Sequence, residues 1–213
     1  MTAAPAEDPA AGPVDSLEMR WIVPGQLPPA MLEWFARFPA GTETRQDAYL
    51  LQPRLRGLSV KLRDGGVLDV KSYLGSPGIL DLPRGGGHGR LESWRKWSFP
   101  TGLPGHGGAG PPGWAVVGKS RRSSRFPLAS RPDPAQVPPS AAVTGCMAEL
   151  TEVRVRSETW WSVGFEATGP VCLLRGALEH AADLVFAQAL PPGVQFSLEN
   201  SQSYAHWLGQ RPA

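Results

Sequence analysis

The chain has 213 residues, enough for one domain whose core needs no disulfide or metal to fold. A net charge of +2 provides no basic surface of the kind that binding to a nucleic acid polymer requires. No apolar run approaches the ~18 residues of a membrane span, and residues 1–13 lack the regions of a signal peptide. We therefore expect a disordered N-terminal tail and a cytoplasmic protein without membrane contact. Cys146 and Cys172 have no metal-ligand spacing and are expected to be reduced thiols.

Short segments that alternate polar and apolar residues dominate the rest of the chain, as is typical of half-buried β-strands. The first, residues 16–23, is followed by an amphipathic helix at 28–38. The clearest hairpin joins residues 55–62 to 67–73 through the turn Asp64-Gly65-Gly66, whose glycines supply positive φ. Further strands are predicted at 46–52, 90–99, 114–122, 146–156 and 160–167, and further helices at 176–190 and 200–209.

The strands carry charged residues at paired i, i+2 positions, and therefore on one face. In an open sheet that face would meet water, whereas in a closed sheet it would line the interior, and periodicity alone does not decide. We predict an α+β, mainly β fold: a closed antiparallel tunnel-like barrel of about eight strands with a few flanking helices, lined by Lys and Arg with a few Glu. It forms one domain, residues 14–210, with Gly/Pro-rich loops near 85–89, 101–113 and 126–140.

Several segments, in this order, resemble the CYTH family, also called triphosphate tunnel metalloenzymes: SLEMRWIV, LSVKLRDGGVLDVKSYLG, VGKSRR, MAELTEV and WWSVGFEA. The final SQSYAHWL is similar to the Ser-x-Ser-Tyr…Trp-Leu ending of that family. The resemblance extends over residues 14–210. It implies a tunnel in which basic residues hold a triphosphate and carboxylates hold one or two divalent metals, usually Mg²⁺ or Mn²⁺.

The basic positions of the family pattern are retained. We expect the following side chains to bind the substrate: Arg20, Lys61, Arg63, Lys71, Trp94, Lys96, Lys119 and Arg121. For Lys119 and Arg121, which lie beside further arginines, a solvated strand face is the alternative. Trp94 shares a face with Glu92 and Lys96, so its indole either stacks on a planar ligand or fills the barrel.

The acidic positions are thinned, because each expected Glu-x-Glu pair has only one carboxylate. The pairs stand here as Ser16 with Glu18, Glu92 with Trp94, Glu149 with Thr151, and Gly164 with Glu166. Single Glu residues could hold one Mg²⁺ or Mn²⁺ ion with waters completing an octahedron, and the expected ligands are then Glu18, Glu149 and Glu166. Alternatively, these carboxylates pair with the interior Arg and Lys and bind no metal.

Three functions are compatible with this pattern. The leading hypothesis is a phosphohydrolase-like enzyme that binds a phosphorylated small molecule, a triphosphate in particular. It would catalyse metal-assisted phosphoryl hydrolysis or transfer with Glu18, Glu166 and Lys61 as catalytic residues. The second is a non-catalytic module that binds an anion or nucleotide. The third is a tunnel recruited for a different reaction on a non-phosphate substrate, with Glu as acid or base. The thinned carboxylates favour anion binding over two-metal hydrolysis.

Overall fold

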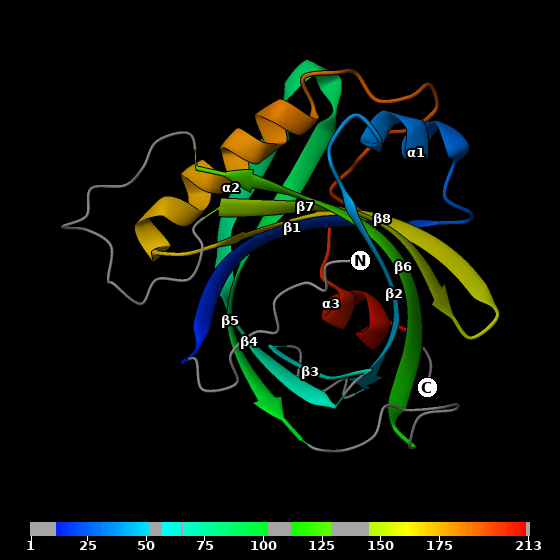
Figure 1. The fold of residues 1–213 in the computed structure, drawn as a ribbon, viewed down its shortest axis with the longest axis vertical. Coiled ribbons are helices and arrows are strands. Elements are labelled where there is room, and N and C mark those ends of the chain that lie inside the picture. Colours follow the sequence, from blue (N-terminus) through cyan, green and yellow to red (C-terminus); the bar gives the residue numbers. More distant parts are fainter. Residues whose placement is uncertain (1–11, 52–56, 65, 102–111, 129–144, 212–213) are drawn as a thin grey trace.

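The structure is a computed structural model that describes residues 12–51, 57–64, 66–101, 112–128 and 145–211. Its antiparallel strands close into a barrel in the order β1-β5-β4-β3-β2-β6-β7-β8 (Figure 1). The predicted closed barrel of about eight strands is therefore confirmed. The strands are β1 Val14–Pro24, β2 Gly41–Leu50, β3 Leu58–Arg63, β4 Val67–Leu82, β5 Gly87–Pro100, β6 Trp114–Pro127, β7 Gly145–Val155 and β8 Glu158–Thr168. The helices are α1 Pro29–Phe35, α2 Val171–Val185 and α3 Tyr204–Gly209, with a 3-10 turn, η1, at Pro83–Gly85.

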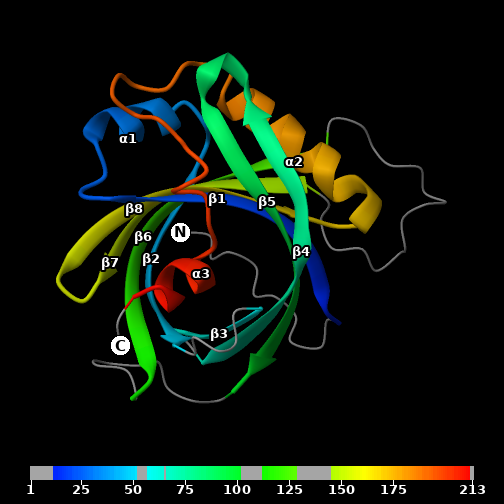
Figure 2. The ribbon, with the colours of Figure 1, turned by 180° about the vertical axis from the view of Figure 1, so that it is seen from behind.

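The predicted hairpin is the β3–β4 pair, in which Lys61 lies opposite Asp69. β4 is longer than predicted, and together with β5 it extends past the barrel as a hairpin (Figure 2). The loop predicted at 85–89 is instead the tip of this hairpin, since β5 already begins at Gly87. Close packing explains Gly89, because a Cβ there would lie 2.2 Å from the Met19 sulfur. Most of the N-terminal tail and of the other two predicted loops lies outside the described residues.

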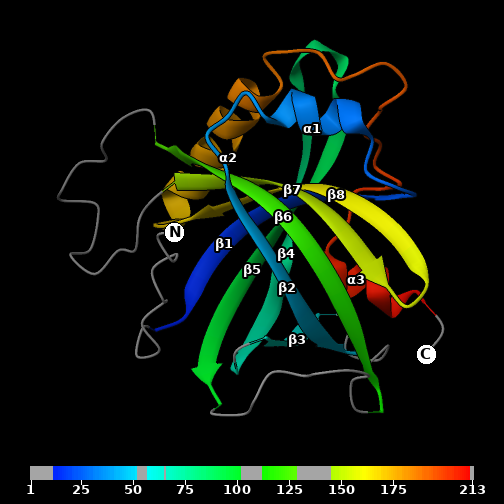
Figure 3. The same ribbon diagram turned by 45° about the vertical axis from the view of Figure 1, so that its right-hand side comes forward.

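The main hydrophobic core lies outside the barrel wall, where α1 and α2 cover the strands β1, β7 and β8 (Figure 3). Leu17, Met19 and Trp21 alternate along β1 and point into this core. Trp21 is fully buried and stacks on Phe196 with ring centroids 4.7 Å apart. Because the apolar face of β1 packs against this core outside the barrel wall, the opposite, charged face of β1 points into the barrel.

The short helix α3 lies within the ring of strands and fills one end of the barrel (Figures 1 and 2). Trp207 and Leu208 are buried there against Ile22, Val117 and Val153 of the barrel wall. The buried side chains of α3 therefore form an apolar plug at this end of the barrel. Among the described residues, no helix is long and apolar enough to cross a membrane.

Candidate functional site in the barrel interior

Charged side chains at alternate strand positions point into the barrel. Lys71 of β4 donates to Glu18 of β1 and Glu166 of β8, although neither strand is a neighbour of β4. Arg20 of β1 reaches Glu149 of β7 in the same way. Contacts between strands that do not pair cross the interior, so the charged face is the inner one.

The described interior and its mouth are close to charge balance. Six strands contribute cationic side chains, which are Arg20, Arg45, Lys61, Arg63, Lys71, Lys96, Lys119 and Arg121. The carboxylates are Glu18, Glu43, Asp47, Asp69, Glu92, Glu149 and Glu166. The expected lining of Lys and Arg with a few Glu is therefore wrong in its balance, because acidic partners from β2 and β4 nearly match the cations.

The acidic partners that sequence reasoning missed lie mainly on β2. This strand was predicted at 46–52 but begins at Gly41, so Glu43, Arg45 and Asp47 alternate along one face. Asp47 is fully buried, and its partners are cations of β2 and β6. The alternation in GTETRQD was the signal that could have identified these residues.

Glu149 lies between two guanidinium groups. Its Oε2 accepts from Arg20 at 3.0 Å, and its Oε1 accepts from Arg121 at 2.5 Å. Burial alone would raise the pKa of this carboxyl, but Arg121 and Arg20 outweigh burial and lower the pKa to about 2. Arg121 also pairs with Glu43 at the exposed mouth of the barrel. Glu149 thus serves as an internal counter-ion.

Lys119 is enclosed by polar and aromatic groups next to the α3 plug. Its Nζ donates to Asp47 at 3.0 Å and to the Tyr49 hydroxyl at 2.6 Å, and it lies 3.9 Å from the ring centroid of Tyr204. Burial lowers the pKa of Lys119 to about 7, although Asp47 opposes this shift. The side chain is 6% exposed, so the solvated-face alternative is wrong for Lys119.

Lys61 and Arg63 of β3 share one carboxylate. Asp69 accepts from Arg63 Nε at 2.6 Å and from Ser98 Oγ at 2.7 Å, and its carboxylate is 3.1 Å from Lys61 Nζ. Burial would raise the pKa of Asp69, yet Lys61 and Arg63 lower it to about 2. Two predicted ligand-binding cations are therefore neutralised in part by a residue of the same hairpin.

Three glutamates lie side by side on β5, β1 and β8, and we call them the glutamate row. Glu18 is directly opposite Glu92 on one side and Glu166 on the other. Lys71 Nζ lies between two of them, 2.5 Å from Glu18 Oε1 and 3.2 Å from Glu166 Oε1. This ammonium is the main cause of the lowered pKa of Glu166. The pKa of Glu92 is instead raised by burial.

The expected metal ligands do not form one cluster. Glu149 is engaged by two arginines, and Lys71 takes the space between Glu18 and Glu166. Within the described ranges, no group of three or more His, Cys, Asp or Glu side chains is arranged to hold a metal ion. The donor set in this arrangement therefore does not fit a divalent cation, which requires several oxygens with no ammonium among them.

At two of the thinned Glu-x-Glu pairs, the residue that stands in place of the missing carboxylate donates a hydrogen bond to the glutamate that remains. Ser16 Oγ donates to Glu18 at 3.0 Å, and the Trp94 indole nitrogen donates to Glu92 at 3.1 Å. Trp94 is 3% exposed and packs on Tyr73 with ring centroids 5.1 Å apart. This geometry favours the barrel-filling alternative for Trp94 over stacking on a ligand.

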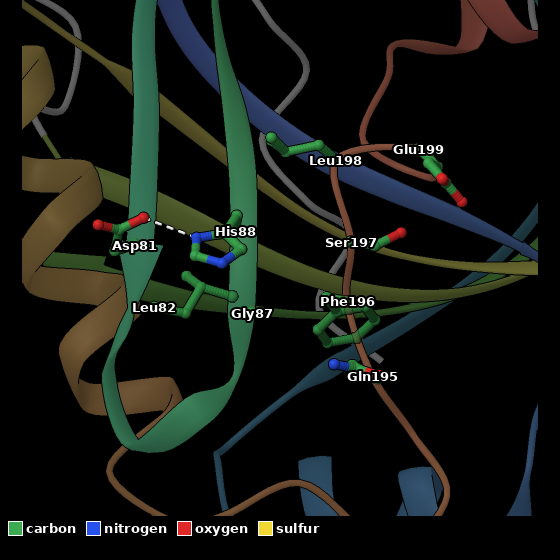
Figure 4. A pocket seen from close by; sticks show the side chains of 9 residues that line it. All are labelled: Asp81, Leu82, Gly87, His88, Gln195, Phe196, Ser197, Leu198 and Glu199. Atoms are coloured by element: carbon green, nitrogen blue, oxygen red, sulfur yellow. Dashed lines mark hydrogen bonds and ion pairs between the residues drawn. The ribbon is translucent and has the colours of Figure 1, made fainter.

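A separate cavity of about 500 Å³ lies where the β4–β5 hairpin meets residues 195–199 (Figure 4). His88 Nδ1 and Asp81 Oδ1 are 2.7 Å apart in its wall, and both side chains are largely exposed. Its lining, also shown in Figure 4, is Asp81, Leu82, Gly87, His88, Gln195, Phe196, Ser197, Leu198 and Glu199. Among the residues that the structure describes, none lines both this cavity and the charged interior.

Comparison with known proteins supplies similarity of fold only. No family model matches the sequence, and no curated protein matches it. A search of solved structures finds the mimivirus capping enzyme triphosphatase, with 8% identity, a TM-score of 0.44, and coverage of 86% of this chain and 92% of that chain.

Two further solved structures have comparable similarity. The putative adenylyl cyclase HpAC1 from Hippeastrum, described as having a dominant triphosphatase activity, shows 15% identity and a TM-score of 0.39, with coverage of 84% of this chain and 92% of that chain. The RNA triphosphatase Pct1 of S. pombe shows 9% identity and a TM-score of 0.39, with coverage of 82% and 78%. At these values the similarity assigns no function to this chain.

Proposed function

We propose that the barrel binds a phosphorylated small molecule, a triphosphate in particular, in its interior. The observation that supports this proposal is the convergence of Lys and Arg side chains from six strands on the interior of the barrel. Among them, Arg63, Arg121 and Lys71 have side chains that are 25%, 20% and 18% exposed, so a ligand can reach them. Several convergent cations, including planar guanidinium groups, suit the oxygens of a polyphosphate.

The carboxylates that pair with the interior cations limit how such a ligand can bind. Because each accessible cation already has a carboxylate partner, the ligand must compete with that carboxylate. Glu43, 45% exposed, is the partner of Arg121 that can turn into solvent most easily. We therefore propose that phosphate oxygens replace Glu43 on Arg121, while the buried Glu149 keeps its two arginines.

Titration calorimetry of the full chain with tripolyphosphate, in buffer with EDTA, tests this proposal. Wild type should bind saturably, and Arg121→Gln should weaken binding by about tenfold or more, since a charge-assisted phosphate contact is lost. Glu43→Gln should strengthen binding because it removes the competing carboxylate. Arg154→Gln is the matched control, since Arg154 is 72% exposed on the outer surface. No binding, or equal affinity of wild type and Arg121→Gln, would contradict the proposal.

Metal-assisted hydrolysis or transfer of that ligand is the second candidate. The glutamate row favours it, because it brings carboxylates of three strands together. Glu18, Glu166 and Lys61 are the residues proposed to act on the phosphoryl group, although the present arrangement of donors does not fit a metal. Release of phosphate from tripolyphosphate or nucleoside triphosphates that requires Mg²⁺ or Mn²⁺ and is lost in Glu18→Gln would support this activity. Its absence under binding conditions would leave a non-catalytic module. A cytoplasmic location stays a prediction.

A further inference from the structure

A lysine ammonium lies where the glutamate row needs positive charge. Carboxylates directly opposite each other on neighbouring strands repel, and Glu18 and Glu166 form such a pair across β1 and β8. Two ionised carboxylates that lie side by side are stabilised by a cation between them or by a shared proton. Lys71 supplies the cation from β4, with Nζ at 2.5 Å from Glu18 and 3.2 Å from Glu166.

The surroundings hold Lys71 in this position. Its neighbours across the sheet are Ser59 on β3 and Lys96 on β5, so the backbone register directs its side chain into the barrel. Lys96, directly opposite Lys71, adds a second positive charge near Glu166. A divalent cation that approached Glu18 and Glu166 would meet two ammonium groups, and its entry would require Lys71 to leave.

We propose that Lys71 takes the place of a divalent metal in this barrel. The ammonium of Lys71 pairs with both Glu18 and Glu166. As long as it lies between them, a metal ion cannot bind to these two carboxylates. One consequence, which also rests on the proposed function, is that a phosphorylated ligand binds without metal. The replacement itself concerns only residues of the chain, so it can be tested without any ligand.

The test is titration of the ligand-free full chain with Mn²⁺, followed by electron paramagnetic resonance of the free ion and by calorimetry. The variants are Lys71→Met, which removes the charge but keeps an unbranched side chain, and Lys71→Met combined with Glu166→Gln. Lys61→Met is the matched control, because it removes another interior ammonium that pairs with Asp69 instead of the row. Circular dichroism and thermal unfolding check folding, and Lys71→Gln replaces Lys71→Met if the latter does not fold.

Wild type and Lys61→Met should show no saturable Mn²⁺ binding. Lys71→Met should bind Mn²⁺ saturably and at least about tenfold more tightly than wild type, since one repelling charge is gone and Glu18 and Glu166 have lost the ammonium that they share. The added Glu166→Gln should abolish this gain. The proposal is overturned if wild type binds Mn²⁺ at a site that Glu18→Gln removes, or if folded Lys71→Met or Lys71→Gln gains no Mn²⁺ affinity. Failure of wild type to bind tripolyphosphate would contradict the proposed function and leave this result untouched.

Discussion

The guanidinium of Arg20 lies directly against Gly164. A Cβ at Gly164 would be 2.5 Å from Arg20 Cζ, well inside van der Waals contact. The position at which the resemblance implies a second carboxylate on β8 is therefore the position that makes room for Arg20. The guanidinium reaches Glu149 through this space. Any side chain larger than glycine at position 164, including a second carboxylate, would therefore overlap the guanidinium of Arg20.

Gly164→Ala should destabilise the protein by about 1–3 kcal/mol, because an added methyl group overlaps the buried guanidinium. Urea denaturation monitored by tryptophan fluorescence measures the effect. Gly176→Ala is the control: Gly176 is exposed on α2, and nothing lies within 4 Å of the place that an added methyl group would take. Alanine there should stabilise the helix by about 0.5–1 kcal/mol. Equal stability of Gly164→Ala and wild type would show that Arg20 moves aside without cost.

Glu149→Gln should cost about 3–5 kcal/mol at pH 7, since it leaves the buried guanidinium of Arg20 without its carboxylate and removes one of the two carboxylate partners of Arg121. The side chain is only 5% exposed, so solvent screens this interaction little. Denaturation midpoints of the variant and wild type provide the measurement. Glu152→Gln, which affects an exposed pair with Arg154, should change stability by no more than about 0.5 kcal/mol.

The cost of Glu149→Gln should depend on pH. The folded pKa of about 2 lies below the ordinary value of 4.5, so the carboxylate's contribution is fully present above pH 4.5 and is lost as the pH falls toward 2. The stability difference between wild type and Glu149→Gln should therefore shrink by about 2 kcal/mol between pH 7 and pH 3. A difference that does not vary over this range would mean that the two arginines do not stabilise the ionised form.

Lys119 should make stability rise with pH above neutrality. Its folded pKa of about 7 lies below the ordinary 10.5, so between these values the unfolded chain binds a proton that the folded chain does not. Over pH 7.5–9, wild type should gain about 1 kcal/mol per pH unit relative to Lys119→Met. Parallel stability curves for the two proteins would show that Asp47 and Tyr49 keep the ammonium charged.

Trp207→Ala should destabilise the protein by about 3–5 kcal/mol, because it leaves a cavity in the plug formed by α3. Trp207 is 3% exposed and meets Trp160 edge-on at 5.3 Å. Thermal unfolding measures the loss. Leu184→Ala, at a side chain of α2 that is 43% exposed, is the control and should be nearly neutral. A small effect of Trp207→Ala would show that α3 is not required to close the barrel.

Local patterns in the sequence were sufficient for much of the fold. Alternation identified every strand of the barrel, and the Asp64-Gly65-Gly66 turn identified the β3–β4 hairpin, because side-chain period and turn chemistry depend on neighbouring residues. The predicted boundaries are less accurate. β2 begins five residues earlier than predicted, so the strand also contains Glu43 and Arg45. A helix predicted at 176–190 lies at Val171–Val185.

The sequence by itself determined which residues carry charge and that they share one face of each strand. It also showed the thinned carboxylates at Glu18, Glu149 and Glu166. Only the tertiary structure decided which face of each strand lies inside the barrel and which charged residues form ion pairs. The reason is that the pairs of Lys71 and Arg20 join strands that are not neighbours in the sheet. Lys71 and Glu166 are 95 residues apart, and closure of the barrel alone brings them within 3.2 Å. Glu166, which the sequence predicts to be a metal ligand, is therefore the ion-pair partner of Lys71 in the folded protein.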